Sequence, residues 1–311
     1  MPRLISALGA CATTAALAML ASACGGGSAD DTSRDSQLDD FFPPPQGSLQ
    51  LPGAVPADLP PRCAPGGGRT VTPGELTIAT DDPAYEPWFI DNDPANGQGL
   101  EGAVARAVAD SLGYPPDLTS FIRVPFTDAL ESGPKNFDFA ISQFSILGQR
   151  RDNVDFSAPY YAVAQAVVTR AENPAASATT LSDLENVRLG AHAGSTALYA
   201  AAHSIHPADA PAEYPTTDDA IDALIDGDID ALIADLPTAL QIASARLDDG
   251  VVAGRFPAPN EVTEFFGLVL EKDSPFTECA TLALEHLHHE GILENLADQW
   301  ISSADEVPVL R

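Results

Sequence analysis

From residue 74 to the end of the chain, short apolar runs alternate with longer segments in which apolar residues recur at helical spacing. The strand-like runs cover 76–80, 137–142, 188–191, 230–234 and 266–270, and the helix-like segments cover 102–113, 195–202, 218–226, 236–247, 277–288 and 292–300. This alternation predicts an α/β fold with mostly parallel sheets covered by helices. About 240 residues are available, which is enough for two lobes of about 100 residues or more.

The stretch before this region has a different composition. Residues 25–72 are rich in Gly, Pro, Ser and Asp and show no sustained apolar period. Such a segment cannot bury enough apolar surface to offset the entropy lost when it becomes ordered. We therefore predict a disordered tether over residues 24–72.

The first residues have the order of a secretory signal. Arg3 is followed by an apolar run over 4–20 and by small residues directly before Cys24. This order resembles a bacterial lipoprotein signal, in which residues 1–23 are removed and the Cys is lipidated on its sulfur. Cleavage after Ala23 without lipidation is the alternative. No later segment reaches the roughly 20 apolar residues of a membrane span, so any membrane attachment is expected through the lipid.

The chain is strongly acidic. It contains 15 Lys or Arg and 45 Asp or Glu, and removal of residues 1–23 takes away one Arg and no acid, which leaves a formal charge of −31. Such a surface repels phosphate backbones, whereas nucleic-acid binding needs a basic face that releases counterions. Nucleic acid is therefore excluded as a partner. The charge favours solubility outside the cell and a mild attraction of cations.

Four cysteines are present: Cys11, Cys24, Cys63 and Cys279. The first is removed with the signal, and the second is the expected lipidation site. In an oxidising compartment, two remaining cysteines pair more often than they stay free. The sequence therefore predicts a disulfide between Cys63 and Cys279, with two unpaired thiols as the alternative.

Polar side chains follow four of the predicted strands at their carboxyl ends. They are Asp81 and Asp82, then Ser142, Gln143 and Ser145, then Ser195 and Thr196, and finally Asp235. In open α/β sheets, ligands bind outside the carboxyl ends of the strands. Polar groups that converge from several strand ends therefore predict a ligand cleft between the two lobes.

Six segments resemble the extracellular solute-binding proteins that serve polar amino acid ABC importers, in the version common in actinobacteria. They are 80–88 (TDDPAYEPW), 133–139 (GPKNFDF), 145–150 (SILGQR), 154–161 (VDFSAPYY), 227–235 (GDIDALIAD) and 291–293 (GIL), with Trp300 near the end. The resemblance covers nearly everything from Gly74 to Arg311. It implies the type II periplasmic-binding-protein fold, with two α/β lobes and a ligand cleft between them. The first lobe is expected to contain residues 73–162 plus 266–311, and the second residues 163–265.

The resemblance also implies a carboxylate site. The family's carboxylate-binding Arg lies six residues before the Phe of an Asp-Phe-Ser segment, which here places Arg150 before Phe156. A planar guanidinium suits a carboxylate because it donates two charge-assisted hydrogen bonds. Ser145, Ser195 and Thr196 match the hydroxyls and amides that complete this site. The alternatives are that the Arg bridges surface acids and that the hydroxyls cap helices.

Further residues match positions around the rest of the ligand. Asp235 matches the carboxylate that receives the ligand's α-ammonium, with an N-cap of the following helix as the alternative. Tyr85 and Phe126 match rings that sandwich the ligand, with burial in the core as the alternative. Asp82 matches a position that meets the ligand's side chain and favours a cationic or polar ligand. Residues 147–149 depart from the family pattern, so the resemblance names a ligand class and no single ligand.

The resemblance implies the extracytoplasmic, lipid-anchored substrate-binding component of an ABC importer. It would be a monomer that closes on an amino acid or amino-acid-like solute and presents the closed form to a membrane permease, with no cofactor, metal or catalytic residue. A tethered sensor for a receptor is one alternative, and a neighbouring permease gene would distinguish the two. A dehydratase-like cleft enzyme is the other, but no spacing singles out Glu86 or Glu101 as its acid.

Overall fold

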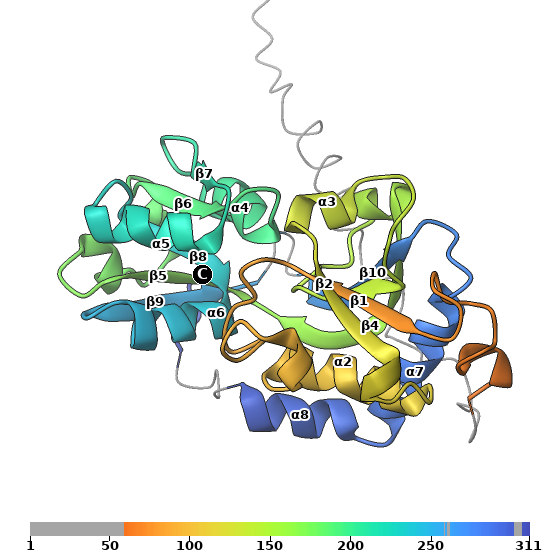
Figure 1. Ribbon diagram of the computed structural model, residues 1–311. Coiled ribbons are helices and arrows are strands. Elements are labelled where there is room, and N and C mark those ends of the chain that lie inside the picture. The colour runs from red at the N-terminus through yellow and green to blue at the C-terminus, as the bar shows by residue number, and fades with distance from the viewer. Residues whose placement is uncertain (1–58, 258, 260–261, 302–306) are drawn as a thin grey trace, which may run out of the picture.

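The computed structural model describes residues 59–257, 259, 262–301 and 307–311. These residues form two lobes, each built on its own five-stranded sheet with helices packed against it (Figure 1). The predicted signal peptide, Cys24 and most of the predicted tether lie outside the described residues. Within the described part of the chain, no helix is long and apolar enough to cross a membrane.

The first lobe is built from two segments that are distant in the sequence. In spatial order its sheet consists of β2 (Thr119–Arg123), β1 (Leu76–Thr80), β3 (Phe139–Ala140), β10 (Glu264–Glu271) and β4 (Val154–Val163). β1 pairs in parallel with β2 and β3, whereas β10 runs antiparallel to β3 and β4. The helices of this lobe are α2 (Leu100–Ser111), α3 (Phe126–Leu130), α7 (Thr277–His289) and α8 (Ile292–Trp300).

The second lobe repeats this arrangement. Its sheet consists of β7 (Ala212–Tyr214), β6 (Leu189–His192), β8 (Ala231–Asp235), β5 (Gln165–Arg170) and β9 (Gly250–Phe256). β6 pairs in parallel with β7 and β8, whereas β5 runs antiparallel to β8 and β9. The helices are α4 (Thr196–Ala200), α5 (Thr217–Asp226) and α6 (Leu236–Gln241), and α4 and α6 continue into the π-helical turns Ala201–Ile205 and Ile242–Arg246.

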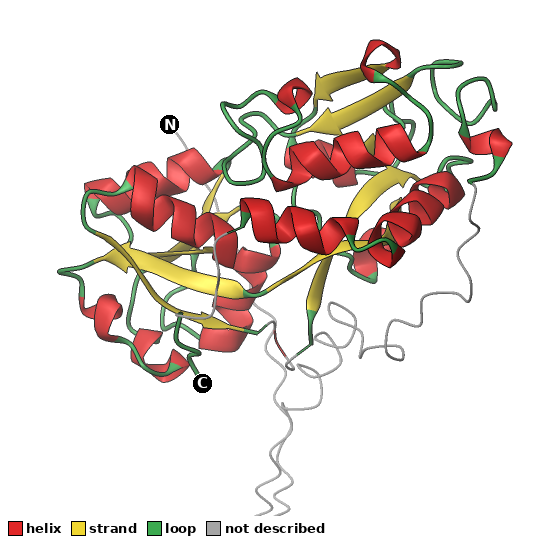
Figure 2. Ribbon diagram, turned by 90° about the horizontal axis from the view of Figure 1, so that it is seen from below, coloured by secondary structure: helices red, strands yellow, loops and turns green. Residues whose placement is uncertain are grey.

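Both sheets are mixed, but four of the five strands in each run in the same direction, so the prediction of mostly parallel sheets holds for all strands except β10 and β5. The chain passes from β4 into β5 at Val163–Gln165 and returns from β9 into β10. A strand that enters a lobe from the side of the other lobe must run away from it, whereas the parallel strands run toward it. β5 and β10 are these entering strands, so each is antiparallel to its neighbours. Figure 2 shows the two lobes side by side.

The central strands of each sheet are buried on both faces, which explains why β8 and β10 consist mainly of apolar residues. In β1, Ile78 packs into one apolar cluster and Ala79 into another. In β5, Val167 and its neighbour Val168 divide in the same way between the two clusters of the second lobe. This alternation follows from the two-residue period of a strand. Because both faces are covered by apolar side chains, the polar groups lie at the ends of the strands.

The last residues of the chain lie on the second lobe, although residues 266–311 are predicted to belong to the first. Val309 pairs with Arg255 of β9, and the Leu310 side chain is 1% exposed. A Cβ atom added at Gly254 would lie 2.5 Å from the Leu310 Cγ, so Gly at this position leaves room for Leu310. Residues 307–311 therefore pack on the second lobe, where Figures 1 and 2 mark the C-terminus.

The predicted tether ends earlier than residue 72. Cys63 forms a disulfide with Cys279 of α7, with the two Cα atoms 5.4 Å apart, which confirms the predicted pairing. Cys63 is fully buried, and the Val71 amide donates to the Asp138 carboxylate at 2.7 Å. Residues 59–72 are therefore part of the first lobe, because the disulfide and these contacts hold them against it.

Candidate functional site

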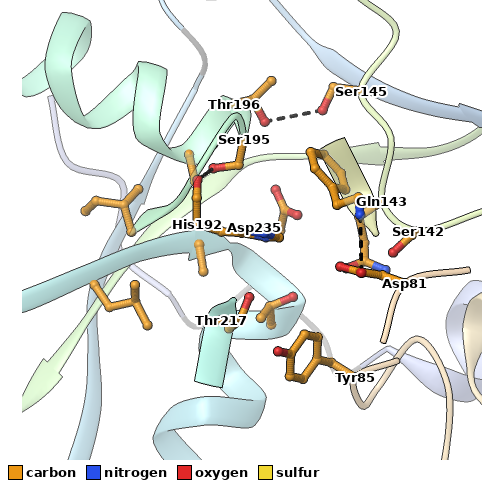
Figure 3. A pocket seen from close by; sticks show the side chains of 16 residues that line it. Asp81, Tyr85, Ser142, Gln143, Ser145, His192, Ser195, Thr196, Thr217 and Asp235 are labelled. Carbon is orange, nitrogen blue, oxygen red and sulfur yellow. Dashed lines mark hydrogen bonds between the residues drawn. The ribbon is translucent and has the colours of Figure 1, made fainter. Parts of the chain in front are cut away.

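A cavity lies between the lobes at the carboxyl ends of their parallel strands (Figure 3). Its lining comes from both lobes and consists of Asp81, Tyr85, Phe126, Ser142, Gln143, Ser145, His192, Ser195, Thr196, Ala197, Thr217, Leu232, Ile233, Ala234, Asp235 and Thr238. Eight of the ten residues predicted to bind ligand are in this set, and the exceptions are Asp82 and Arg150. The strand-end rule therefore brings together residues that are distant in sequence.

Asp82 does not line the cavity, which corrects its predicted placement. It is exposed, and Asp81 faces the cavity instead. The Asp81 Oδ1 accepts hydrogen bonds from the Asp82 amide at 2.8 Å and from the Phe126 amide at 3.2 Å. These hydrogen bonds hold the Asp81 carboxylate directly after the carboxyl end of β1. Burial raises its pKa, which hydrogen bonds and the charge of His192 partly offset.

Arg150 lies behind the cavity wall and does not line the cavity. Its Nη1 donates to the Ser145 carbonyl at 2.9 Å, and its Nη2 donates to the Gly194 carbonyl at 3.0 Å. Because these carbonyls belong to different lobes, the guanidinium joins the lobes. Its Cζ lies 5.5 Å from the centroid of the Phe126 ring, within range of a cation–π contact. Arg150 is 8% exposed, so the alternative that it bridges surface acids does not hold.

Glu264, the first residue of β10, holds the hydroxyls that the sequence assigns to a ligand carboxylate. Its carboxylate accepts hydrogen bonds from the Ser145 Oγ, from the Thr196 Oγ1 at 2.5 Å and from the Gln165 Nε2 at 2.9 Å. The two hydroxyl oxygens lie 3.2 Å apart and come from different lobes. Glu264 is 3% exposed. The strand-end rule does not reach this residue, because it stands at the beginning of its strand.

Asp235 ends β8 and faces the cavity from the second lobe. Its Oδ1 accepts a hydrogen bond from the Gln165 Nε2 at 2.9 Å. Burial raises the pKa of Asp235 well above its usual range, and the charge of Glu264 raises it further. Burial lowers the pKa of Arg150 to about 10, so this side chain remains a cation at neutral pH and offsets part of the negative charge. The alternative role of Asp235 as a side-chain cap of α6 has no hydrogen bond to support it.

Glu101 is a fully buried acid near the cavity. Its Oε1 accepts from the Gln143 amide at 2.6 Å and from the Tyr160 hydroxyl, and its Oε2 accepts from the Gln143 Nε2 at 2.6 Å. Burial raises the pKa of Glu101 to about 7. Gln143 has a φ of 48°, a conformation that costs energy for a residue with a side chain. Glu101 therefore fixes the loop after β3, and Gln143 separates it from the cavity.

Several hydrogen bonds cross directly from one lobe to the other. The Trp88 Nε1 donates to the Thr238 Oγ1 at 2.8 Å, and the Gln241 Nε2 donates to the Glu86 Oε2 at 2.9 Å. The cavity has a volume of about 60 Å³. Drug-sized ligands occupy pockets of about 300–1,000 Å³. The lobes therefore lie close together, and a larger ligand requires them to move apart.

Besides Asp81, three lining residues with polar side chains are absent from the predicted site. His192 is the last residue of β6, so the strand-end rule could have found it, whereas Thr217 and Thr238 lie in the first turns of α5 and α6. The ring centroids of His192 and Phe126 are 5.3 Å apart across the cleft. Burial lowers the pKa of His192, and the charge of Asp81 partly offsets this effect.

Comparisons with known proteins give the same fold. Residues 76–303 match the profile of the bacterial extracellular solute-binding proteins, family 3. An arginine-binding periplasmic protein of Mannheimia haemolytica is 23% identical over 236 residues, which cover 75% of this chain and 94% of that protein. A glutamate-binding protein of Corynebacterium glutamicum is 26% identical over 199 residues, which cover 62% of this chain and 66% of that protein.

A solved structure supports the two-lobe architecture. An ancestral arginine-binding protein bound to arginine has a TM-score of 0.60 and 26% identity, over 74% of this chain and 99% of that one. These findings confirm the predicted type II periplasmic-binding-protein fold, whereas the actinobacterial lipoprotein type stays a prediction. The family match covers most of the sequence. The chain belongs to the bacterial extracellular solute-binding proteins, family 3.

Proposed function

We propose that the protein is the substrate-binding component of an ABC importer and binds an amino acid or amino-acid-like solute between its lobes. One observation carries the proposal: eight predicted ligand-binding residues, from segments between Tyr85 and Asp235, line a single cavity to which both lobes contribute. Membership of the family and similarity to proteins named for arginine and glutamate binding support it. The bound solute would hold the lobes together, and the closed form would be the signal to the permease.

The cavity offers a site for an ammonium group. The Asp235 carboxylate accepts a hydrogen bond from the Gln165 Nε2. Burial and the charge of Glu264 destabilise its ionised form. A ligand cation placed beside it would relieve both effects, because an opposite charge favours the ionised carboxylate. Tyr85 and Phe126 line the same cavity from the first lobe and would contact the apolar part of the ligand.

The sequence supports a position outside the cell. We infer that residues 1–23 are removed, that Cys24 is lipidated and that the protein remains attached to the cell membrane as a monomer beside its permease. The disulfide between Cys63 and Cys279 fits an oxidising compartment. A tethered sensor would use the same cleft, and a permease gene beside this one would favour the transport role.

Binding without catalysis is the better interpretation of the buried acids. Glu101 has a pKa of about 7, a value that suits a general acid. However, both of its carboxylate oxygens are occupied by Gln143 and Tyr160, and it does not line the cavity. Glu86 is exposed and bonded to Gln241. Neither carboxylate is therefore placed to protonate a solute in the cavity.

A thermal-shift screen of the mature chain tests this function. We expect at least one compound among the amino acids, opines and amines derived from amino acids to raise the melting temperature by about 5–10 °C. The reason is that a ligand at 100 times its dissociation constant adds about 2.7 kcal/mol of stability. Asp235→Asn should weaken binding of that compound at least about tenfold, because the ammonium loses its charged partner.

Asp82→Asn is the matched control, because Asp82 is also an acid at a strand end but lies outside the cavity. The dissociation constant of the compound from the screen should be the same for the Asp82→Asn variant as for the unmodified chain. The proposed function is wrong if no compound in the screen changes the melting temperature. The proposed site is wrong if a compound binds and Asp235→Asn affects its binding no more than Asp82→Asn does.

A further inference from the structure

Glu264 brings a carboxylate of the protein itself to the hydroxyls between the lobes. The Ser145 hydroxyl comes from the first lobe and the Thr196 hydroxyl from the second, and both donate to the Glu264 Oε1. The Gln165 Nε2 donates to the other carboxylate oxygen at 2.9 Å. Glu264 is therefore held by three donors in a buried position, and its displacement would leave all three without this acceptor.

The groups around Glu264 are rich in acceptors. Asp235 shares the Gln165 Nε2 with Glu264. The Gln165 Oε1 is buried and has no hydrogen-bond partner among the described residues. Buried acceptors of this kind are normally satisfied. An additional donor near Gln165 would satisfy this oxygen, whereas an additional carboxylate would supply none.

Positive charge near these acids is limited. Arg150 is the cation whose charge acts on Asp235 and Glu264, and both of its terminal nitrogens already donate to backbone carbonyls. Burial disfavours the charged form of His192, which lies across the cavity, and lowers its pKa. A second carboxylate beside Ser145 and Thr196 would face Glu264 at short range. The two carboxylate charges would repel each other strongly, because they would be close together in a site that is largely shielded from water.

We propose that Glu264 is a specificity-determining residue that makes the cleft select an organic cation without a carboxylate beside Ser145 and Thr196. The preferred ligand carries amino or guanidinium groups, which donate to Asp235 and the Gln165 Oε1. A carboxylate on the same carbon skeleton lowers the affinity, because Glu264 already uses the hydroxyls that would hold it. This inference rests on the proposed function and narrows its ligand class.

Pairs of compounds that differ by one carboxylate test the inference. Agmatine is arginine without its carboxylate, and cadaverine is lysine without its carboxylate. Calorimetric titration of the mature chain should give at least a tenfold lower dissociation constant for the amine of a pair than for the amino acid. Glu264→Gln should reduce this preference at least tenfold, because Gln has nearly the same shape and no charge.

Glu271→Gln is the matched control. Glu271 ends the same strand, and its Oε2 accepts from the Lys135 amide at 2.7 Å, away from the cavity. This variant should keep the preference of the unmodified chain. The unmodified chain alone tests the direction of the preference, so the test does not depend on whether Glu264→Gln folds.

The outcomes separate the inference from the proposed function. If the unmodified chain binds the amino acid as tightly as the amine or more tightly, the role of Glu264 is overturned and the amino-acid-binding function stands. If Glu264→Gln leaves the preference unchanged, the preference does not come from Glu264. If neither these pairs nor any compound of the thermal-shift screen binds, the inference and the proposed function are both overturned.

Discussion

Arg150→Met is expected to lower the free energy of unfolding by about 3–5 kcal/mol at pH 7, because it removes one partner from a buried group of charges. Arg150 is 8% exposed, and its charge acts on Glu264 and Asp235. Met has a similar length but carries no charge and donates no hydrogen bond. The Ser145 and Gly194 carbonyls also lose their donors. Urea unfolding followed by circular dichroism measures the change.

A double-mutant cycle shows whether the charges cause this loss. Glu264→Gln in the Arg150→Met background should recover at least about 1 kcal/mol, because Gln needs no cation nearby. It can still accept hydrogen bonds from the Ser145 and Thr196 hydroxyls through its amide oxygen. If the double variant is no more stable than Arg150→Met, the loss comes from packing and the missing hydrogen bonds, and the electrostatic role of Arg150 is wrong.

Replacement of Cys63 and Cys279 by Ser is expected to lower the free energy of unfolding by about 5 kcal/mol. The disulfide joins residues separated by 216 positions, so it removes a large amount of chain entropy from the unfolded state. It also fastens the N-terminal segment of the first lobe to α7. The urea midpoint of the double variant, compared with that of the oxidised mature chain, measures the effect.

Arg62→Ala is the matched control for the disulfide. Arg62 precedes Cys63 and pairs with Glu278 at 2.6 Å, but both side chains are exposed. Surface ion pairs contribute little to stability, so this variant should keep the urea midpoint of the unmodified chain. Equal midpoints for the oxidised chain and the variant without cysteines would mean that the disulfide does not stabilise the fold.

The strands that are buried runs of apolar residues could be predicted from the sequence. β8 is the clearest case, because residues 231–234 are all buried and Asp235 ends the strand. β4 could not be recognised as a strand, because Ser157 and Pro159 interrupt its apolar pattern. Its pairing with β10 is itself irregular near Gly267. In that pair, contacts between distant segments determine the structure more than local preference does.

In the candidate site as well, some residues could be predicted from local sequence pattern and others depend on contacts between distant segments. Residues after strands could be found because the carboxyl ends of parallel strands converge on one edge of a sheet. Glu264 could not be found in this way, because it is the first residue of an antiparallel strand, whereas the rule selects residues that follow the carboxyl ends of parallel strands. Asp81 lines the cavity in place of Asp82, and its carboxylate accepts a hydrogen bond from the Phe126 amide, a contact between distant segments that a strand-end pattern does not contain.

The C-terminal end shows a further limit. Residues 307–311 follow the helices of the first lobe, yet Leu310 is buried against the second. A single apolar side chain near the end of a chain does not reveal which surface it contacts. Here the space left by Gly254 receives it, and that space depends on the position of β9.

Trp88 offers the most direct test of ligand binding between the lobes. Its indole Nε1 donates to the Thr238 Oγ1 across the cleft at 2.8 Å, so its surroundings depend on the distance between the lobes. The chain contains two Trp residues. Trp300→Phe therefore leaves Trp88 as the source of Trp fluorescence. The compound with the largest thermal shift is titrated into this variant.

Binding between the lobes predicts a saturable change in Trp88 emission, with a midpoint equal to the calorimetric dissociation constant. The same titration in the Asp235→Asn background should shift this midpoint at least about tenfold to higher concentration. A compound that binds by calorimetry while Trp88 emission stays constant, with equal affinity for the Asp235→Asn variant, would contradict the proposal that the cleft is the binding site.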